Sequence, residues 1–143
     1  MSKVNSLHHI VFSTFCREKS ITPAYAPDLY RYIWGIIRNQ GCKLYRIGGI
    51  ENHIHMLIDL NPMISLSSFV KEVKRCSNLW IKDNLEKYPA YKGWARGYYA
   101  FSVNYRDRQK VIDYIISQPE HHKVTDSEKE LENLLQSEGL SDA

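Results

Sequence analysis

Cysteine is scarce in this chain: there are three in 143 residues, widely spaced and with no C-x-x-C pair among them. An odd, dispersed set argues against a disulfide framework and against a cysteine zinc site, and it fits a reducing compartment. Long hydrophobic runs are absent too, since no stretch approaches the roughly 20 apolar residues that span a bilayer. The leading Met-Ser-Lys-Val-Asn lacks the features of a secretory signal. We therefore expect a cytoplasmic protein that does not enter a membrane.

The composition is that of an ordinary globular protein, 43% hydrophobic and 24% charged, with no internal repeat and no low-complexity linker. A chain of 143 residues is long enough to bury one hydrophobic core without disulfides or a structural metal, and it corresponds to a single domain. We expect that domain to cover residues 1–123, followed by an acidic C-terminal helix or tail over 124–143.

Charge is distributed unevenly along the chain. Residues 124–143 carry six acidic side chains and one lysine, so the rest of the chain has 18 basic and 10 acidic residues. This excess of positive charge suits a polyanionic partner such as nucleic acid. A solvated basic surface explains the charge equally well, so charge alone does not decide between the two.

Alternating hydrophobic residues predict four strands. They cover residues 7–14, residues 43–50, a histidine-containing stretch within 51–60, and residues 98–103. Either Gly48-Gly49 or Glu51-Asn52 supplies the turn between the second and third strands, which would form an antiparallel hairpin.

Helical spacing predicts the helices between and after these strands. The first runs from Asp28 to a cap at Gly41, the second follows Ser65 as its N-cap, and the third follows Asn104 and ends before Pro119. A last helix starts at Thr125 with Glu128 and has an apolar face of Leu131, Leu134 and Leu135. The order β-α-β-β-α-β predicts an α+β, ferredoxin-like (split β-α-β) fold. Its antiparallel sheet would have helices on one face plus the C-terminal helices, and one sheet face would stay open for function.

Two histidines in the third strand form a candidate metal site. In an extended strand His53 and His55 share one face, while Ile54, Met56 and Ile58 take the other. Imidazoles one strand repeat apart, roughly 6.6 Å between Cα atoms, can converge on one cation. Hydrogen-bonded strand histidines without a metal are the competing interpretation.

Tyr114 and Gln118 form a second notable pair, one helical turn apart. The apolar stripe of their helix consists of Val111, Ile112, Ile115 and Ile116. At about 100° per residue Tyr114 falls well off this stripe and Gln118 lies at its border, so both can point into a cleft. Position alone favours a surface tyrosine.

Together these motifs resemble the single-tyrosine HUH transposases of small bacterial insertion sequences, the insertion sequence 200/605 group. The resemblance lies in three segments: His53-Ile54-His55 followed by Met-Leu-Ile, Tyr114-Ile-Ile-Ser-Gln118 followed by Glu120-His121-His122-Lys123, and Ser65-Leu-Ser-Ser opening a basic helix. Elements in the matching order extend from Leu7 to about Lys123.

The resemblance implies a transposase that cleaves and rejoins single-stranded DNA at hairpin-bearing insertion-sequence ends. Tyr114 would be the catalytic nucleophile and would form a 5′-phosphotyrosine. His53, His55 and Gln118 would hold a divalent metal, Mg²⁺ or Mn²⁺. It also implies a homodimer whose active sites can be shared between subunits.

Several basic residues are candidates for contact with DNA phosphates. They are Lys71, Lys74, Arg75, Arg96 and Arg106. For Lys71, Lys74 and Arg75, which lie on the helix after Ser65, a solvated helix face is an equally good interpretation.

Two other functions compete with the transposase. A non-catalytic or domesticated nucleic-acid-binding relative would use the same sheet, but it would not need Tyr114 with His53 and His55. A metal-dependent hydrolase would release its product and would not keep it attached to a tyrosine.

Overall fold

The computed structural model describes residues 2–121 and 127–140. The strands are β1 (Leu7–Ser13), β2 (Lys43–Ile50), β3 (His53–Asp59) and β4 (Tyr99–Val103). The helices are α1 (Ala26–Asn39), α2 (Leu66–Lys82), α3 (Arg108–Ile116), α4 (Gln118–His121) and α5 (Ser127–Ser137). Short 3-10 turns occur at η1 (Phe15–Arg17), η2 (Pro23–Tyr25) and η3 (Tyr105–Asp107).

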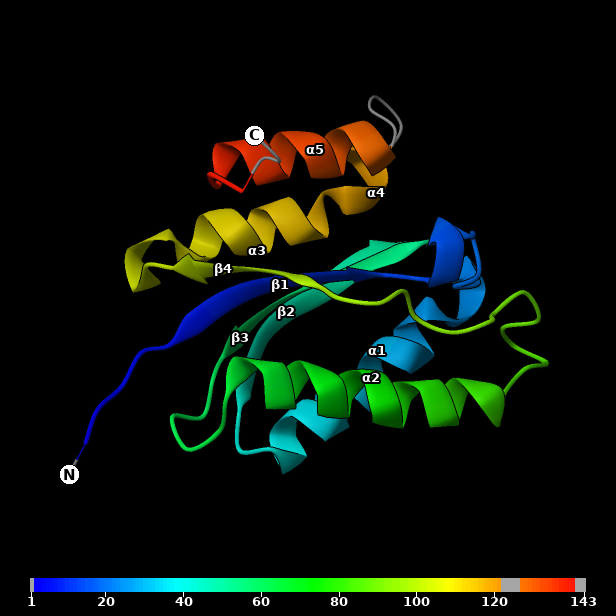
Figure 1. Ribbon diagram of the computed structural model, residues 1–143, viewed down its shortest axis with the longest axis horizontal. Helices are drawn as coiled ribbons and strands as arrows, with labels where there is room; N and C mark the ends of the chain where they lie inside the picture. Colours follow the sequence, from blue (N-terminus) through cyan, green and yellow to red (C-terminus); the bar gives the residue numbers. More distant parts are fainter. Residues whose placement is uncertain (1, 122–126, 141–143) are drawn as a thin grey trace.

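Within these residues the strands form one sheet in the order β2-β3-β1-β4, with every neighbouring pair antiparallel. This is the ferredoxin-like, α+β arrangement that the sequence predicts (Figure 1). The register sets His53 opposite Ser13 of β1 and Ile50 of β2, and it sets His55 opposite Val11 and Gly48. The histidines therefore lie on an inner strand, with a paired strand on each side.

The main core lies between the sheet and the helices α1 and α2, which cover the same sheet face (Figure 1). Strand alternation directs Ile54, Met56 and Ile58 of β3 into this core, where each is fully buried. The helices supply residues at helical spacing, including Leu29, Ile33, Ile37, Phe69 and Val73. The predicted apolar face of the histidine strand is confirmed.

Several predicted element ends are also confirmed. The Ser65 hydroxyl accepts a hydrogen bond from the Ser68 amide at 3.1 Å and caps α2. Gly41 follows α1 with φ of +72°, the left-handed conformation of a helix C-terminus. A Cβ at this position would lie 2.8 Å from the side-chain nitrogen Nδ2 of Asn61. Glu51 and Asn52 form the turn between β2 and β3, whereas Gly48 and Gly49 lie within β2.

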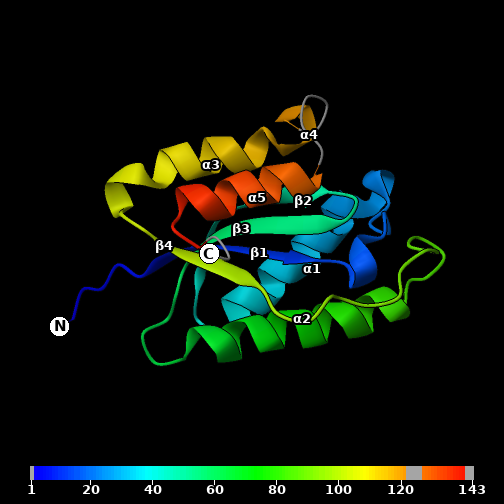
Figure 2. The ribbon, with the colours of Figure 1, turned by 45° about the horizontal axis from the view of Figure 1, so that its top comes forward.

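The opposite sheet face is covered as well, by α3 and α5 (Figures 1 and 2). Ile115 of α3 packs on Leu57 and Leu7, and Leu134 and Leu135 of α5 pack on the cluster of Val11 and Phe101. The expectation of an open face is therefore wrong for the described residues, because the predicted apolar face of the tail helix docks there.

The predicted helix after Asn104 is divided into η3, α3 and α4, and Ser117 separates α3 from α4. Asn104 accepts from the Arg106 amide, so it caps η3 and not α3. Ile116, predicted for the apolar stripe, has 49% of its surface exposed. Pro119 has no amide N–H to donate to the Ile115 carbonyl, and the helical hydrogen-bond pattern is interrupted between α3 and α4.

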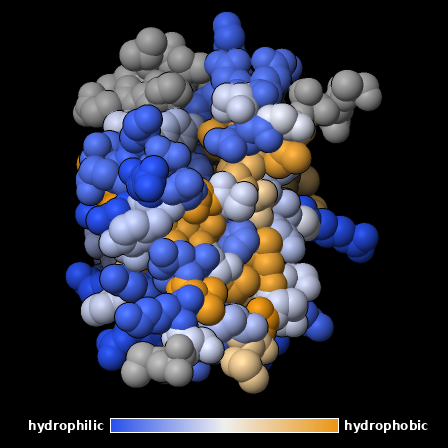
Figure 3. Space-filling view, turned by 90° about the vertical axis from the view of Figure 1, so that its left-hand side faces the viewer, coloured by the Kyte–Doolittle hydropathy of each residue, from blue (hydrophilic) through white to orange (hydrophobic). Residues whose placement is uncertain are grey.

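No helix in the described ranges is long and apolar enough to cross a membrane. The surface on the side of the N-terminus is mainly hydrophilic, with a band of hydrophobic residues down its middle (Figure 3). The predicted helix start at Thr125 and the proposed boundary between residues 123 and 124 lie outside the described residues.

Candidate active site

His53 and His55 project from β3 toward the face that α3 and α5 cover. They are 4% and 0% exposed, and their ring centroids lie 4.9 Å apart. The sequence predicts that the two rings share one strand face, and the structure shows them close together there; their burial is not predicted, because that face was expected to be open. Burial of polar groups costs free energy unless other polar groups or a cation compensate it.

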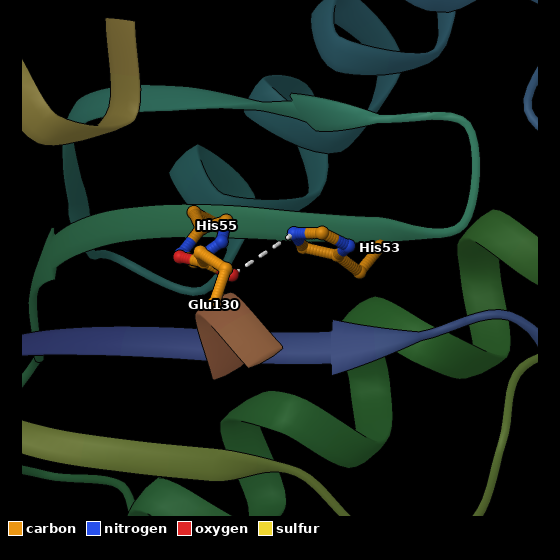
Figure 4. Close-up of side chains that lie close together, drawn as sticks. All are labelled: His53, His55 and Glu130. Carbon is orange, nitrogen blue, oxygen red and sulfur yellow. Dashed lines mark ion pairs between the residues drawn. The ribbon is translucent and has the colours of Figure 1, made fainter. Parts of the chain in front are cut away.

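Glu130 of α5 joins the two histidines (Figure 4). One ligand atom from each of the three residues lies within 4.8 Å of the others, and Glu130 Oε2 is 3.9 Å from His53 Nε2. Burial raises the pKa of the Glu130 carboxyl to about 7. A buried carboxylate beside two imidazoles is a setting that a bound cation would stabilise.

Glu130 is absent from the sequence prediction, which treats the tail only as an acidic amphipathic helix. One signal was available, because Glu130 lies four residues before Leu134 and so shares the apolar face of the helix. An acid on the buried face of a helix indicates a partner in the core. The sequence does not show which partner, since α5 reaches the site only through tertiary packing.

The donor set of this cluster fits a divalent metal. Two imidazole nitrogens and a carboxylate oxygen can bind Mn²⁺ or Zn²⁺, and the oxygen also suits Mg²⁺. Three protein donors leave coordination positions for other ligands, as catalytic metal sites do. The cluster therefore supports the presence of a metal more strongly than its identity.

Tyr114 lies against the histidines. Its ring is 5.6 Å from His55 and 5.9 Å from His9, in edge-to-face contact with both. The side chain is half-buried, so the interpretation of a plain surface tyrosine does not fit. The next residue, Ile115, anchors α3 to the sheet against Leu57.

Gln118 is fully buried at the first position of α4. Its side-chain amide donates to the Tyr114 carbonyl at 3.3 Å. The predicted pair is thus joined by a hydrogen bond, although the two residues lie in separate helices. Gln118 as a metal ligand stays a prediction.

His9 of β1 completes the buried cluster. A hydrogen bond of 2.9 Å joins His9 Nε2 to His55 Nδ1, and the His9 ring is 3% exposed. Burial lowers the pKa of His9 to about 4, so the ring is neutral at pH 7. His9 therefore contributes a hydrogen bond to the cluster as a neutral ring.

The five predicted DNA-contacting residues do not form one group. Lys74 Nζ donates to the carbonyls of Ala95 and Gly97, at 2.7 and 2.8 Å, and so holds the loop before β4. Arg75 pairs with Glu72 on the same helix at 2.7 Å. The other three, Lys71, Arg96 and Arg106, are exposed.

Arg96 lines two neighbouring surface hollows that also share Ala95. One, of about 430 Å³, lies beside α2 and includes Lys74, Arg75, Lys82, Lys92 and Trp94. The other, of about 280 Å³, includes Ser13 and Arg17. Because Ser13 is the strand partner of His53, this basic surface extends from α2 to the histidine end of the sheet.

The sequence and the fold match known proteins of one class, the transposases. The family described as "Transposase IS200 like" matches residues 2–118. The transposase for insertion sequence element IS200 from Salmonella typhimurium is 31% identical over 129 residues, covering 84% of this chain and 81% of that protein. The Salmonella typhi protein of the same name matches equally.

Solved structures share the fold. A candidate transposase from Deinococcus radiodurans has a TM-score of 0.64 at 22% identity, over 82% of this chain and 95% of that one. The REP-associated tyrosine transposase bound to a REP hairpin has a TM-score of 0.60 at 19% identity, over 85% of this chain and 74% of that one. The chain belongs to the IS200-like transposase family, which implies a DNA-cleaving enzyme.

Proposed function

We propose that this transposase cleaves and rejoins single-stranded DNA at insertion-sequence ends, with Tyr114 as the nucleophile. The observation that carries the proposal is the contact of the Tyr114 ring with His55, inside the cluster that offers metal ligands. A hydroxyl nucleophile and a site for a divalent metal are two parts with which enzymes carry out phosphodiester transfer.

The phenol oxygen of Tyr114 would attack the scissile phosphorus. An Oη–P bond forms, the bond from phosphorus to the 3′ oxygen breaks, and that oxygen leaves as a 3′-hydroxyl. The phenol gives up its proton in the same exchange. Because the 5′-phosphotyrosine retains the phosphodiester energy, a 3′-hydroxyl can reverse the reaction and join strands without ATP.

His53 and His55 would hold the metal, Mg²⁺ or Mn²⁺, with Gln118 as the predicted third ligand and Glu130 as the carboxylate that already lies beside the pair. When bound, the cation would neutralise charge that builds on the phosphate oxygens. A phenol is in general a weak nucleophile at neutral pH, so Tyr114 would benefit from nearby positive charge.

The third ligand can be identified by metal titration. Mn²⁺ affinity of the full chain would be compared in Glu130→Gln and Gln118→Leu, with Glu132→Gln as a matched acid control on an exposed face of α5. The residue whose replacement lowers Mn²⁺ affinity more is the stronger candidate for the third ligand. If both variants bind Mn²⁺ as tightly as the wild-type chain, neither Glu130 nor Gln118 is a ligand.

DNA would bind along the basic surface that includes Arg96, Lys92 and Lys82. Trp94 in the same hollow could stack on an unpaired base. We extend the proposal to DNA hairpins as the recognised feature, because a relative with the same fold is bound to a REP hairpin.

We also propose that the chain forms a homodimer whose active sites are completed between subunits. The proposal includes a cytoplasmic location.

The test uses labelled single-stranded oligonucleotides from both flanks of the gene that encodes this chain. With Mn²⁺ we expect a shortened strand and a protein-linked strand that survives denaturation, and we expect EDTA or His53→Ala to remove both. Hairpin binding without cleavage under any metal would favour the non-catalytic relative. A shortened strand with no protein-linked product would favour a hydrolase.

A further inference from the structure

Both candidate metal-binding histidines have their Nδ1 atoms engaged by buried side chains. Asn52 Oδ1 lies 2.8 Å from His53 Nδ1, and His9 Nε2 lies 2.9 Å from His55 Nδ1. Asn52 and His9 come from different elements, the β2–β3 turn and β1. Each is buried, with 7% and 3% of its surface exposed.

The orientation of the Asn52 amide determines the tautomer of His53. Asn52 Nδ2 donates to the Arg17 carbonyl at 3.4 Å, which directs Oδ1 toward His53. A carbonyl oxygen only accepts, so in the neutral ring the proton must be on His53 Nδ1. Nε2 then carries the lone pair, and it is the atom 3.9 Å from Glu130.

The His9–His55 hydrogen bond has two possible directions, since each neutral ring has one donor and one acceptor nitrogen. Only one direction suits a metal ligand. If His55 Nδ1 donates to His9 Nε2, then His55 Nε2 is the unprotonated nitrogen, whose lone pair can bind a cation. The reverse direction would put a proton on His55 Nε2 and remove its lone pair from the ligand set.

We propose that Asn52 and His9 are positioning residues that hold His53 and His55 as Nδ1–H tautomers, with both Nε2 atoms ready for a metal. Partners of this kind orient ligands and raise their basicity, and losing one typically lowers metal affinity roughly 10- to 100-fold. The inference rests on the proposed metal site, but it concerns protons that exist before any metal binds.

The first test reads those protons directly. The full chain, labelled with ¹⁵N-histidine and freed of metal with EDTA, would be examined at pH 8 by long-range ¹H–¹⁵N correlation. Spectra of single histidine variants would assign the rings. We expect a proton on Nδ1 and an unprotonated Nε2 for both His53 and His55. A protonated Nε2 in either ring would overturn the proposal.

The second test measures Mn²⁺ affinity in matched pairs. His9→Phe fills the space without an acceptor, whereas His9→Gln returns an acceptor oxygen at a similar reach. We expect affinity to fall roughly 10- to 100-fold in the first and to recover in the second. His8→Phe, one residue away on the other sheet face, is the control and should bind as the wild type does.

The same comparison applies to the turn, where Asn52→Asp keeps an acceptor and Asn52→Leu removes it. Wild-type affinity in both His9→Phe and Asn52→Leu would contradict the positioning role. If the wild-type chain has both Nδ1–H tautomers but takes up no Mn²⁺, the positioning claim stands and the metal proposal fails. If a variant does not fold, the spectra of the wild-type chain still decide.

Discussion

Replacing Gly48 by alanine should push α3 away from the sheet. A Cβ on Gly48 would lie 3.1 Å from Ile115 Cγ2 and 3.2 Å from the Ile115 carbonyl oxygen. Ordinary contacts are a few tenths of an ångström longer, and a backbone carbonyl cannot rotate out of the way as a flexible side chain can. The helix must therefore move, and Tyr114 is the residue next to Ile115.

Overpacking of this kind costs about 1–3 kcal/mol, and the loss of glycine freedom in the unfolded chain offsets about 0.4–1 kcal/mol of it. We expect a net loss of about 1–2 kcal/mol, which would lower the melting temperature by roughly 3–8 °C in a protein of this size. Because misplacement of a reacting group by about 1 Å can cost a hundredfold in rate, a smaller shift should slow cleavage several-fold.

Gly35→Ala is the matched control. Nothing lies within 4 Å of the Cβ position at Gly35, which is inside α1. Alanine there should stabilise the protein by about 0.5–1 kcal/mol and leave cleavage unchanged. Thermal unfolding and initial cleavage rates of both variants provide the readout. The reasoning is refuted if Gly48→Ala melts no lower than wild type and cleaves at the wild-type rate.

Three further changes test the packing around the site. Ser65→Ala removes the cap of α2 and should cost about 1 kcal/mol in urea unfolding, and an unchanged midpoint would count against the cap. Leu134→Ser with Leu135→Ser should weaken the docking of α5 and speed modification of His55 by diethyl pyrocarbonate, mapped by mass spectrometry; an unchanged rate would mean that α5 does not shield the site. Lys74→Met should lower the melting temperature by leaving two loop carbonyls without their donor, whereas a loss of DNA affinity at unchanged stability would assign Lys74 to DNA instead.

Periodicity made the strand and helix order predictable. Strand alternation assigned His53 and His55 to one face and Ile54 and Met56 to the other, and this holds because each face of the sheet packs against different helices. The same reasoning identified the apolar residues of the tail helix.

The contacts that complete the site depend on information that local patterns do not carry. Glu130 reaches the histidines only because α5 docks on β1 and β4, and His9 meets His55 through the register of neighbouring strands. The sequence places Tyr114 and Gln118 one turn apart, but Pro119 follows a break that puts them in separate helices. Long-range packing decided the positions of Glu130 and His9, whereas the break before Pro119 is a local effect.

The most direct test of the account is the identity of the residue that becomes attached to DNA. The chain has ten tyrosines, so the protein-linked product would be digested with nuclease and protease and the modified peptide sequenced by tandem mass spectrometry. The account predicts a 5′-phosphonucleotide on Tyr114 and no adduct in Tyr114→Phe. An adduct on another residue, or one that persists in Tyr114→Phe, would contradict it.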